Sequence, residues 1–264
     1  MKVNIVLIAS SLVLLMSQVP SLAETDMDAK EIMRQVELQS SAADEVLDIT
    51  MTLVDAEGKE RSRTATLYTK QKSGMDDMRL IRFHTPADIA KSAVLTIENS
   101  DRDNDQWVYL PAYHTTRRIA TANRSDNYMG TDFAYEDITD PRIDEYQYSV
   151  LRQEKHRETE CVVIESIPTA EKLVKETAYS KTVSWVDPKK FVTLKQEFHN
   201  KKGELFKILT NLELKQYGEK YRWQRTEMEN IQTKHKTTNE VTDRKLNTGL
   251  KDNMFTQRYL KRGR

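Results

Sequence analysis

The pattern of apolar and polar positions changes once along the chain, from a helical period to a period of two. In residues 26–39 the apolar Ile32 and Val36 recur at helical spacing, and Asp26 or Asp28 stands ahead of them as a candidate cap. Beyond this segment, apolar residues alternate with polar ones, as in strands that bury one face. The pattern therefore predicts one amphipathic N-terminal helix followed by a mainly β structure.

The alternation predicts about 11–12 strands that follow one another through short turns. The first starts at residue 46 and ends at a turn over 55–58, and the others are residues 61–70, 78–84, 93–98, 107–110, 146–152, 160–167, 178–186, 191–199, 205–214, 221–231 and 235–241. Strands joined to their sequence neighbours favour one large, curved antiparallel sheet or barrel over a sandwich. The tail, residues 246–260, carries Leu250, Phe255 and Tyr259 and could cover an open edge.

The strand over residues 78–84 is apolar on both faces, so each face must be covered or one must line an apolar cavity. A packed core and an open cavity both fit this pattern. If one concave face lines a cavity, its apolar lining residues are expected to be Met51, Leu53, Leu67, Ile81, Phe83, Leu95, Ile97, Trp107, Tyr109, Val183 and Trp185. A slip of one residue in any strand would exchange its two faces.

The first 23 residues have the features of a cleaved secretory signal. Lys2 is followed by an apolar core over residues 5–16, and Ser21 and Ala23 are small residues before the cleavage position. We therefore expect residues 24–264 to form one domain that is exported to the periplasm as a soluble monomer. The only cysteine, Cys161, lies far from residue 24, which predicts no lipid anchor and no internal disulfide.

Charge and motifs argue against several functions. The 41 basic and 41 acidic residues are interleaved without a basic block, which predicts no nucleic-acid partner. The chain lacks the common hydrolase, metalloprotease, thiol-redox and phosphate-loop motifs, and its five histidines stand far apart. We therefore expect no enzyme, no cofactor and no metal site.

The densest cluster of chemistry follows the strand over residues 107–110. Arg117 and Arg118 come first. Residues 132–137, directly after Gly130 and Thr131, then include three carboxylates and two aromatic rings, namely Asp132, Phe133, Tyr135, Glu136 and Asp137. We expect one arginine to pair with one of these carboxylates and to fix residues 121–131 across the mouth of the barrel. Binding of a hard cation and acid–base chemistry are the alternatives for the three acids.

The same segment resembles a known family. The letters WVYLPAYHTTRRI and MGTDFAYEDI, together with FHTP at residues 83–86, are similar to the paired signature of the LolA-like family of outer-membrane lipoprotein-sorting proteins. Thr131 and Ala134 depart mildly from that signature, where serine and threonine are more usual. The resemblance implies an incomplete antiparallel β-barrel, a half-barrel with short lid helices or loops over its mouth.

The resemblance also implies a function. Members of the LolA-like family carry lipid or lipoprotein acyl chains in a hydrophobic cavity, and they are often encoded beside an inner-membrane exporter of the resistance–nodulation–division type. A periplasmic carrier working with such an exporter is therefore the leading hypothesis, since each exposed CH₂ of an acyl chain costs about 0.8 kcal/mol in water. A ligand-free adaptor that docks on the exporter, and a hydrolase built on the acidic cluster, are the alternatives.

Overall fold

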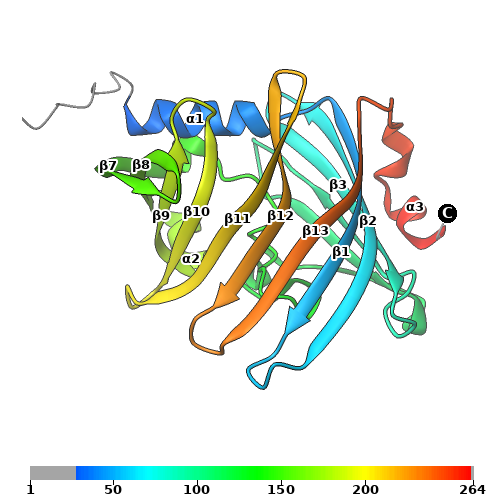
Figure 1. Cartoon of the computed structure of the whole chain (residues 1–264). Helices are drawn as coiled ribbons and strands as arrows, with labels where there is room; N and C mark the ends of the chain where they lie inside the picture. Colours follow the sequence, from blue (N-terminus) through cyan, green and yellow to red (C-terminus); the bar gives the residue numbers. More distant parts are fainter. Residues whose placement is uncertain (1–27, 263–264) are drawn as a thin grey trace, which may run out of the picture.

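The computed structural model describes residues 28–262, so the expected signal segment lies outside the described residues. One antiparallel sheet dominates this part of the chain (Figure 1). Its thirteen strands are β1 (Asp44–Val54), β2 (Glu60–Ser73), β3 (Asp76–Thr85), β4 (Ala93–Ile97), β5 (Asp105–Leu110), β6 (Thr115–Arg118), β7 (Tyr146–His156), β8 (Thr159–Pro168), β9 (Tyr179–Asp187), β10 (Val192–Asn200), β11 (Leu205–Tyr217), β12 (Lys220–Asn230) and β13 (His235–Leu246).

The sheet is curved and open. Its spatial order is β6-β5-β4-β3-β2-β1-β13-β12-β11-β10-β9-β8-β7, so β6 and β7 are edges and do not pair with each other. All strands that follow one another in sequence pair with each other except β6 and β7, and β1 pairs in addition with β13 at the middle of the sheet. The expectation of an incomplete barrel is confirmed, with β6 as a strand beyond those expected.

Local sequence explains the hairpins. In β1, Ile49, Met51 and Leu53 are buried while the threonines between them are half-buried, as expected for a strand with one covered face. The turn to β2 closes because the Asp55 carboxylate accepts hydrogen bonds from two backbone N–H groups and Gly58 adopts a φ of +81°.

The N-terminal helix α1 (Ala29–Ser40) is confirmed. Asp28 caps it by accepting a hydrogen bond from the Glu31 backbone N–H, and Ile32 and Met33 are buried against strands of the second half of the sheet. Figure 1 shows α1 lying along one end of the sheet. The other helices are α2 (Glu171–Glu176), α3 (Gln257–Arg262) and short 3₁₀ turns at Pro111–Tyr113, Thr121–Asn123, Tyr128–Gly130, Ile143–Glu145 and Asp252–Met254.

The C-terminal tail does not cover an edge of the sheet, which corrects the expectation for residues 246–260. Phe255 and Leu260 pack instead on the convex face of β3, β4 and β5. Asp44 fixes the start of this tail, because its carboxylate accepts hydrogen bonds from the backbone N–H groups of Thr248 and Gly249.

A long connection fills half of the concave face. Residues 119–140, here called the plug, run between β6 and β7 and lie inside the curve of the sheet. Tyr128 and Tyr135 of the plug are buried against the inner side chains of β1, β2 and β3, with their ring centroids 5.3 Å apart. The plug thus turns the first half of the concave face into a packed core.

Candidate ligand-binding site

The plug leaves a cavity of about 240 Å³ against the second half of the concave face. Its apolar lining includes Met33 of α1 and Leu173 of α2, and Leu209 and Met228 of β11 and β12 contribute to its wall. Aromatic side chains from both the plug and the sheet line it, namely Phe133, Tyr135, Tyr146, Tyr148, Tyr179 and Phe198. Hydroxyl, amide and charged groups are interspersed, so the cavity suits an amphiphilic ligand rather than a purely apolar one.

The eleven residues expected to line one cavity do not share one face. Five of them do lie together on the concave face, and these are Met51, Leu53, Leu67, Ile81 and Phe83. They form part of the core under the plug and are absent from the lining of the cavity. Phe83, for example, has no exposed surface.

Four others lie on the opposite face, which corrects that part of the expectation. Leu95, Ile97, Trp107 and Tyr109 pack on the convex side with the C-terminal tail. Because successive side chains of a strand point to opposite faces, the concave positions of β4 and β5 belong to their neighbours Val94 and Val108.

Val183 and Trp185 are also misplaced by the expected map. They belong to a convex cluster with Val163 and Leu194. The Trp185 ring is covered by the Lys195 ammonium, 4.2 Å from its centroid, and its indole N–H donates to Glu154. The side of β9 that faces the cavity carries the more polar Thr182. The apolar residues Val183 and Trp185 therefore lie on the face opposite to the expected one.

The acids of the plug have partners other than the expected arginines. Asp132 accepts a hydrogen bond from the Thr237 hydroxyl at 2.6 Å, and His235 Nδ1 lies 2.7 Å from the same oxygen. Arg118 pairs with Asp105 at 2.6 Å instead, and Arg117 has no ion pair among the described residues. The expected pairing is therefore wrong, although the acids do fix this segment to the sheet.

Asp137 is another buried anchor of the plug. Its carboxylate accepts hydrogen bonds from the Tyr179 hydroxyl at 2.8 Å and from the Ala134 backbone N–H at 2.7 Å, and Lys207 Nζ lies 3.5 Å away. The side chains of Lys207 and Asp137 are 1% and 5% exposed. Burial raises the pKa of Asp137, while Lys207 opposes this shift.

Glu136 joins the plug to the start of β9. Its carboxylate accepts a hydrogen bond from the Ala178 backbone N–H at 2.9 Å and lies 3.6 Å from Arg124. Burial raises the pKa of the Glu136 carboxyl group, and burial likewise raises the pKa of the nearby Tyr146 phenol to about 12. The Tyr146 hydroxyl therefore remains protonated at neutral pH.

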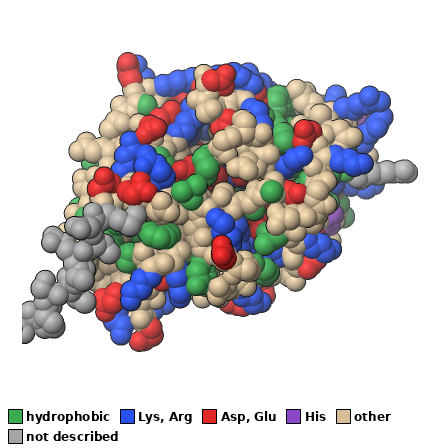
Figure 2. All heavy atoms as spheres, turned by 90° about the horizontal axis from the view of Figure 1, so that it is seen from above, with side chains coloured by type: hydrophobic (Ala, Val, Ile, Leu, Met, Phe, Trp, Pro, Cys, Tyr) green, Lys and Arg blue, Asp and Glu red, His purple; other side chains and the backbone are tan. Residues whose placement is uncertain are grey.

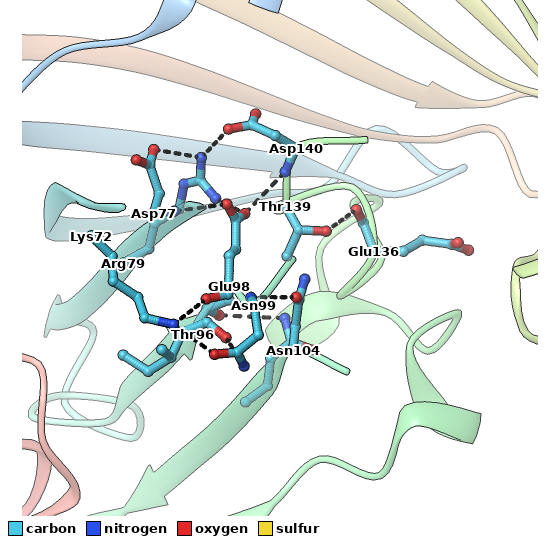
Figure 3. Close-up of polar contacts among 12 residues, drawn as sticks. Lys72, Asp77, Arg79, Thr96, Glu98, Asn99, Asn104, Glu136, Thr139 and Asp140 are labelled. Carbon is cyan, nitrogen blue, oxygen red and sulfur yellow. Dashed lines mark hydrogen bonds and ion pairs between the residues drawn. The ribbon is translucent and has the colours of Figure 1, made fainter. Parts of the chain in front are cut away.

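A second anchor holds the end of the plug to β3 and β4 (Figure 3). Arg79 Nη2 lies 2.6 Å from Asp140 and 3.0 Å from Asp77, and Nη1 contacts Glu98. Glu98 also accepts hydrogen bonds from the backbone N–H groups of Asp77 and Asp140. Burial raises the pKa of Asp77 to about 6 and that of Glu98 to about 7.

A smaller cavity of about 180 Å³ adjoins this anchor, lined by Asp77, Arg79 and Asp140 together with Glu37 and Glu45. Asp140 lines both cavities, so the end of the plug borders each of them.

Sequence reasoning missed Lys207, Tyr179 and Arg79. Lys207 gave one usable signal, because it is a charged residue between the apolar Phe206 and Ile208 of a strand. A charged residue at such a position needs a buried partner.

No group of three or more potential metal ligands occurs among the residues that the structure describes. Between residues 28 and 262, none of the helices combines the length and the apolar run that a bilayer crossing requires. Figure 2 shows basic and acidic side chains mixed over one face of the molecule, with hydrophobic groups between them.

Comparisons with known proteins find close structural relatives. A family model described as an uncharacterized protein matches residues 75–262. A candidate outer-membrane lipoprotein-sorting protein domain from Vibrio parahaemolyticus is 33% identical, with a TM-score of 0.83 over 89% of this chain and 98% of that one. A DUF1329 family protein from Desulfovibrio piger is 26% identical, with a TM-score of 0.82 over 88% and 97% of the two chains.

A LolA superfamily protein from Nitrosomonas europaea shares the fold at 20% identity, with a TM-score of 0.69 over 88% of this chain and 99% of that one. No curated protein matches the chain.

Proposed function

The chain belongs to the LolA-like family of outer-membrane lipoprotein-sorting proteins, and from this premise we propose that it is a periplasmic carrier of lipid or lipoprotein acyl chains. In this proposal, residues 24–264 form one exported domain that acts as a monomer, binds its cargo and catalyses no reaction. It receives or delivers cargo beside an inner-membrane exporter of the resistance–nodulation–division type.

The cavity between the plug and the second half of the sheet is the observation that carries the proposal. Its wall combines apolar side chains such as Leu209 and Met228 with aromatic rings, and its remaining lining is polar. Such a lining can shield part of an acyl chain from water, at about 0.8 kcal/mol for each buried CH₂, while the polar end of the ligand stays near polar groups.

The proposal also changes the role of the residues first expected to line a cavity. Met51, Leu53, Leu67, Ile81 and Phe83 contact the plug, so they would meet a ligand only if the plug moved. The cavity of about 240 Å³ is below the range of roughly 300–1,000 Å³ typical of ligand pockets. We therefore propose that the resting protein holds a single chain, or part of one.

Lipid extraction of the purified protein followed by mass spectrometry tests the carrier function directly. An acyl-containing molecule at near-stoichiometric amount is the expected result. A matched pair of variants on β11 tests the site. Leu209→Asn, in the cavity wall, should weaken binding of a fluorescent lipid, whereas Leu214→Asn, in the convex cluster, should not.

Absence of extracted lipid together with no binding of added lipid would contradict the carrier function and favour a ligand-free adaptor. Equal weakening by both variants would leave the carrier function standing but would place the ligand elsewhere.

A further inference from the structure

The charged groups around the cavity are unequally satisfied. Each of the three cations in its lining already faces a carboxylate of the same cavity. Arg124 lies 3.6 Å from Glu136, Arg142 lies 3.2 Å from Glu145, and Lys172 contacts Asp103. An anionic group entering the cavity would therefore have to compete with carboxylates that are already in place.

The cavity lining contains three further carboxylates, and one of them, Glu176, has no cationic partner within ion-pair distance in the part of the chain that the structure describes, which favours a cationic ligand. Asp137 and Asp140 are paired from behind the wall by Lys207 and Arg79. Glu176, at the end of α2, lines the cavity and forms no ion pair or side-chain hydrogen bond among the described residues. It is half-buried, so a cation placed beside it would be only partly screened by water.

Two further features suit an ammonium group. The rings of Tyr146 and Tyr148 line the cavity with their centroids 6.2 Å apart, and a cation is attracted to the face of such rings. The Ser166 side chain also lines the cavity, and its hydroxyl is buried without a hydrogen-bond partner in the described structure. Ser166 is 5% exposed, so a ligand N–H would satisfy an otherwise unpaired oxygen.

We propose that the ligand of this cavity is a single-chain amphiphile whose polar end is a primary ammonium group. The ammonium group lies by Glu176 and the two tyrosine rings, with Ser166 as a hydrogen-bond acceptor, and the alkyl chain lies along Leu209 and Met228. This inference rests on the proposed carrier function and specifies the chemical class of its cargo.

Three ligands of equal chain length test the inference, namely dodecylamine, dodecanol and dodecanoate. Each is titrated below its micelle concentration at pH 7 against full-length mature protein loaded with the neutral fluorescent probe N-phenyl-1-naphthylamine. Dodecylamine should displace the probe at the lowest concentration, and dodecanoate should be weaker by about tenfold, since a cation–ring contact and a partly exposed ion pair each contribute a few-fold.

A pair of variants on α2 makes the test specific. Glu176→Gln should weaken dodecylamine by about three- to fivefold and leave dodecanol unchanged, because only the ion pair is removed. Glu171→Gln, an exposed acid on the same helix that pairs with Lys175, should change neither ligand. Ser166→Ala should also weaken dodecylamine.

The outcomes separate this inference from the function on which it rests. Dodecanoate or dodecanol binding as tightly as dodecylamine, or an unchanged dodecylamine affinity in Glu176→Gln, would overturn the ammonium assignment while leaving a lipid carrier. Failure of the probe and of all three ligands to bind would overturn the carrier function itself.

Discussion

At the scale of single residues, the sequence shows which side chains need partners but not which partners they have. Asp132, Glu136 and Asp137 do contact the sheet, but through partners other than the expected arginines. These partners are remote, since the Tyr179 hydroxyl that donates to Asp137 is 42 positions away and the Thr237 hydroxyl that donates to Asp132 is 105 away. Closeness in sequence favoured Arg117 and Arg118, and the curvature of the sheet made other groups closer in space.

The buried pair of Lys207 and Asp137 should be strongly coupled. Lys207→Met leaves the Asp137 carboxylate buried without its cation, which should lower the free energy of unfolding by about 3–5 kcal/mol. The double variant with Asp137→Leu should lose clearly less than the sum of the two single variants, as measured by urea denaturation at pH 7.

The matched control for this cycle combines Arg118→Ala with Asp137→Leu. Their effects should add to within about 0.5 kcal/mol, because Arg118 pairs with Asp105. Additive losses for Lys207 and Asp137 would show that the pair does not hold the plug.

The Arg79 cluster should make stability depend on pH. Burial raises the pKa of Glu98 to about 7, above its value in the unfolded chain, so the folded state binds a proton that the unfolded state releases. This contribution is complete below the unfolded pKa and is lost as the pH rises through about 7. The free energy of unfolding should therefore fall through this group between pH 5 and pH 8, by about 1 kcal/mol or more.

Urea denaturation of Glu98→Gln at the two pH values checks this prediction. Between pH 5 and pH 8, the free energy of unfolding should decrease less in the variant than in the wild type, whatever the absolute stability of the variant. Part of the decrease should remain, because burial also raises the pKa of Asp77. Glu158→Gln, whose side chain is 94% exposed, should keep the wild-type fall. Identical falls in Glu98→Gln and wild type would rule out Glu98 as the source.

At the scale of elements, strand positions could be predicted closely, whereas the face of each strand could be predicted for β1, β2 and β3 but not for β4, β5 and β9. A run such as β4 is buried at four of its five positions, so alternation does not distinguish a concave from a convex side chain. The convex face is covered by a tail more than 150 residues farther along the chain. Irregular pairing, such as the shift between Thr193 and Lys195 in β10, also changes which side chains share a face.

The tail should behave as a true part of the core. Phe255 is 5% exposed against the convex face, so Phe255→Ala should lower the free energy of unfolding by about 3–5 kcal/mol. Tyr113→Ala removes an aromatic ring that is 71% exposed and should change stability by no more than about 0.5 kcal/mol. Similar small changes in both variants, measured by urea denaturation, would mean that the tail contributes little to the fold.

At the scale of the whole molecule, the order of the strands was predictable because short turns join nearly every neighbouring pair. The plug was not predictable, since nothing in residues 119–140 states that they lie inside the sheet rather than across its mouth. The open sheet agrees with the expected incomplete barrel, whereas the place of the cavity depends on what the plug leaves unfilled.

The pairing of β1 with β13 affects how the protein is made. Glu45 lies opposite Leu246, so the two strands in the middle of the sheet come from nearly opposite ends of the described chain. During synthesis, which proceeds from the N-terminus, one edge of β1 has no partner until β13, at residues 235–246, has also been made. An unpaired edge of this kind invites association with other chains, and such long-range contacts form slowly. The exposed edge of β1 is therefore protected from aggregation only when β13 pairs with it, long after the family signature at residues 107–137 has been made.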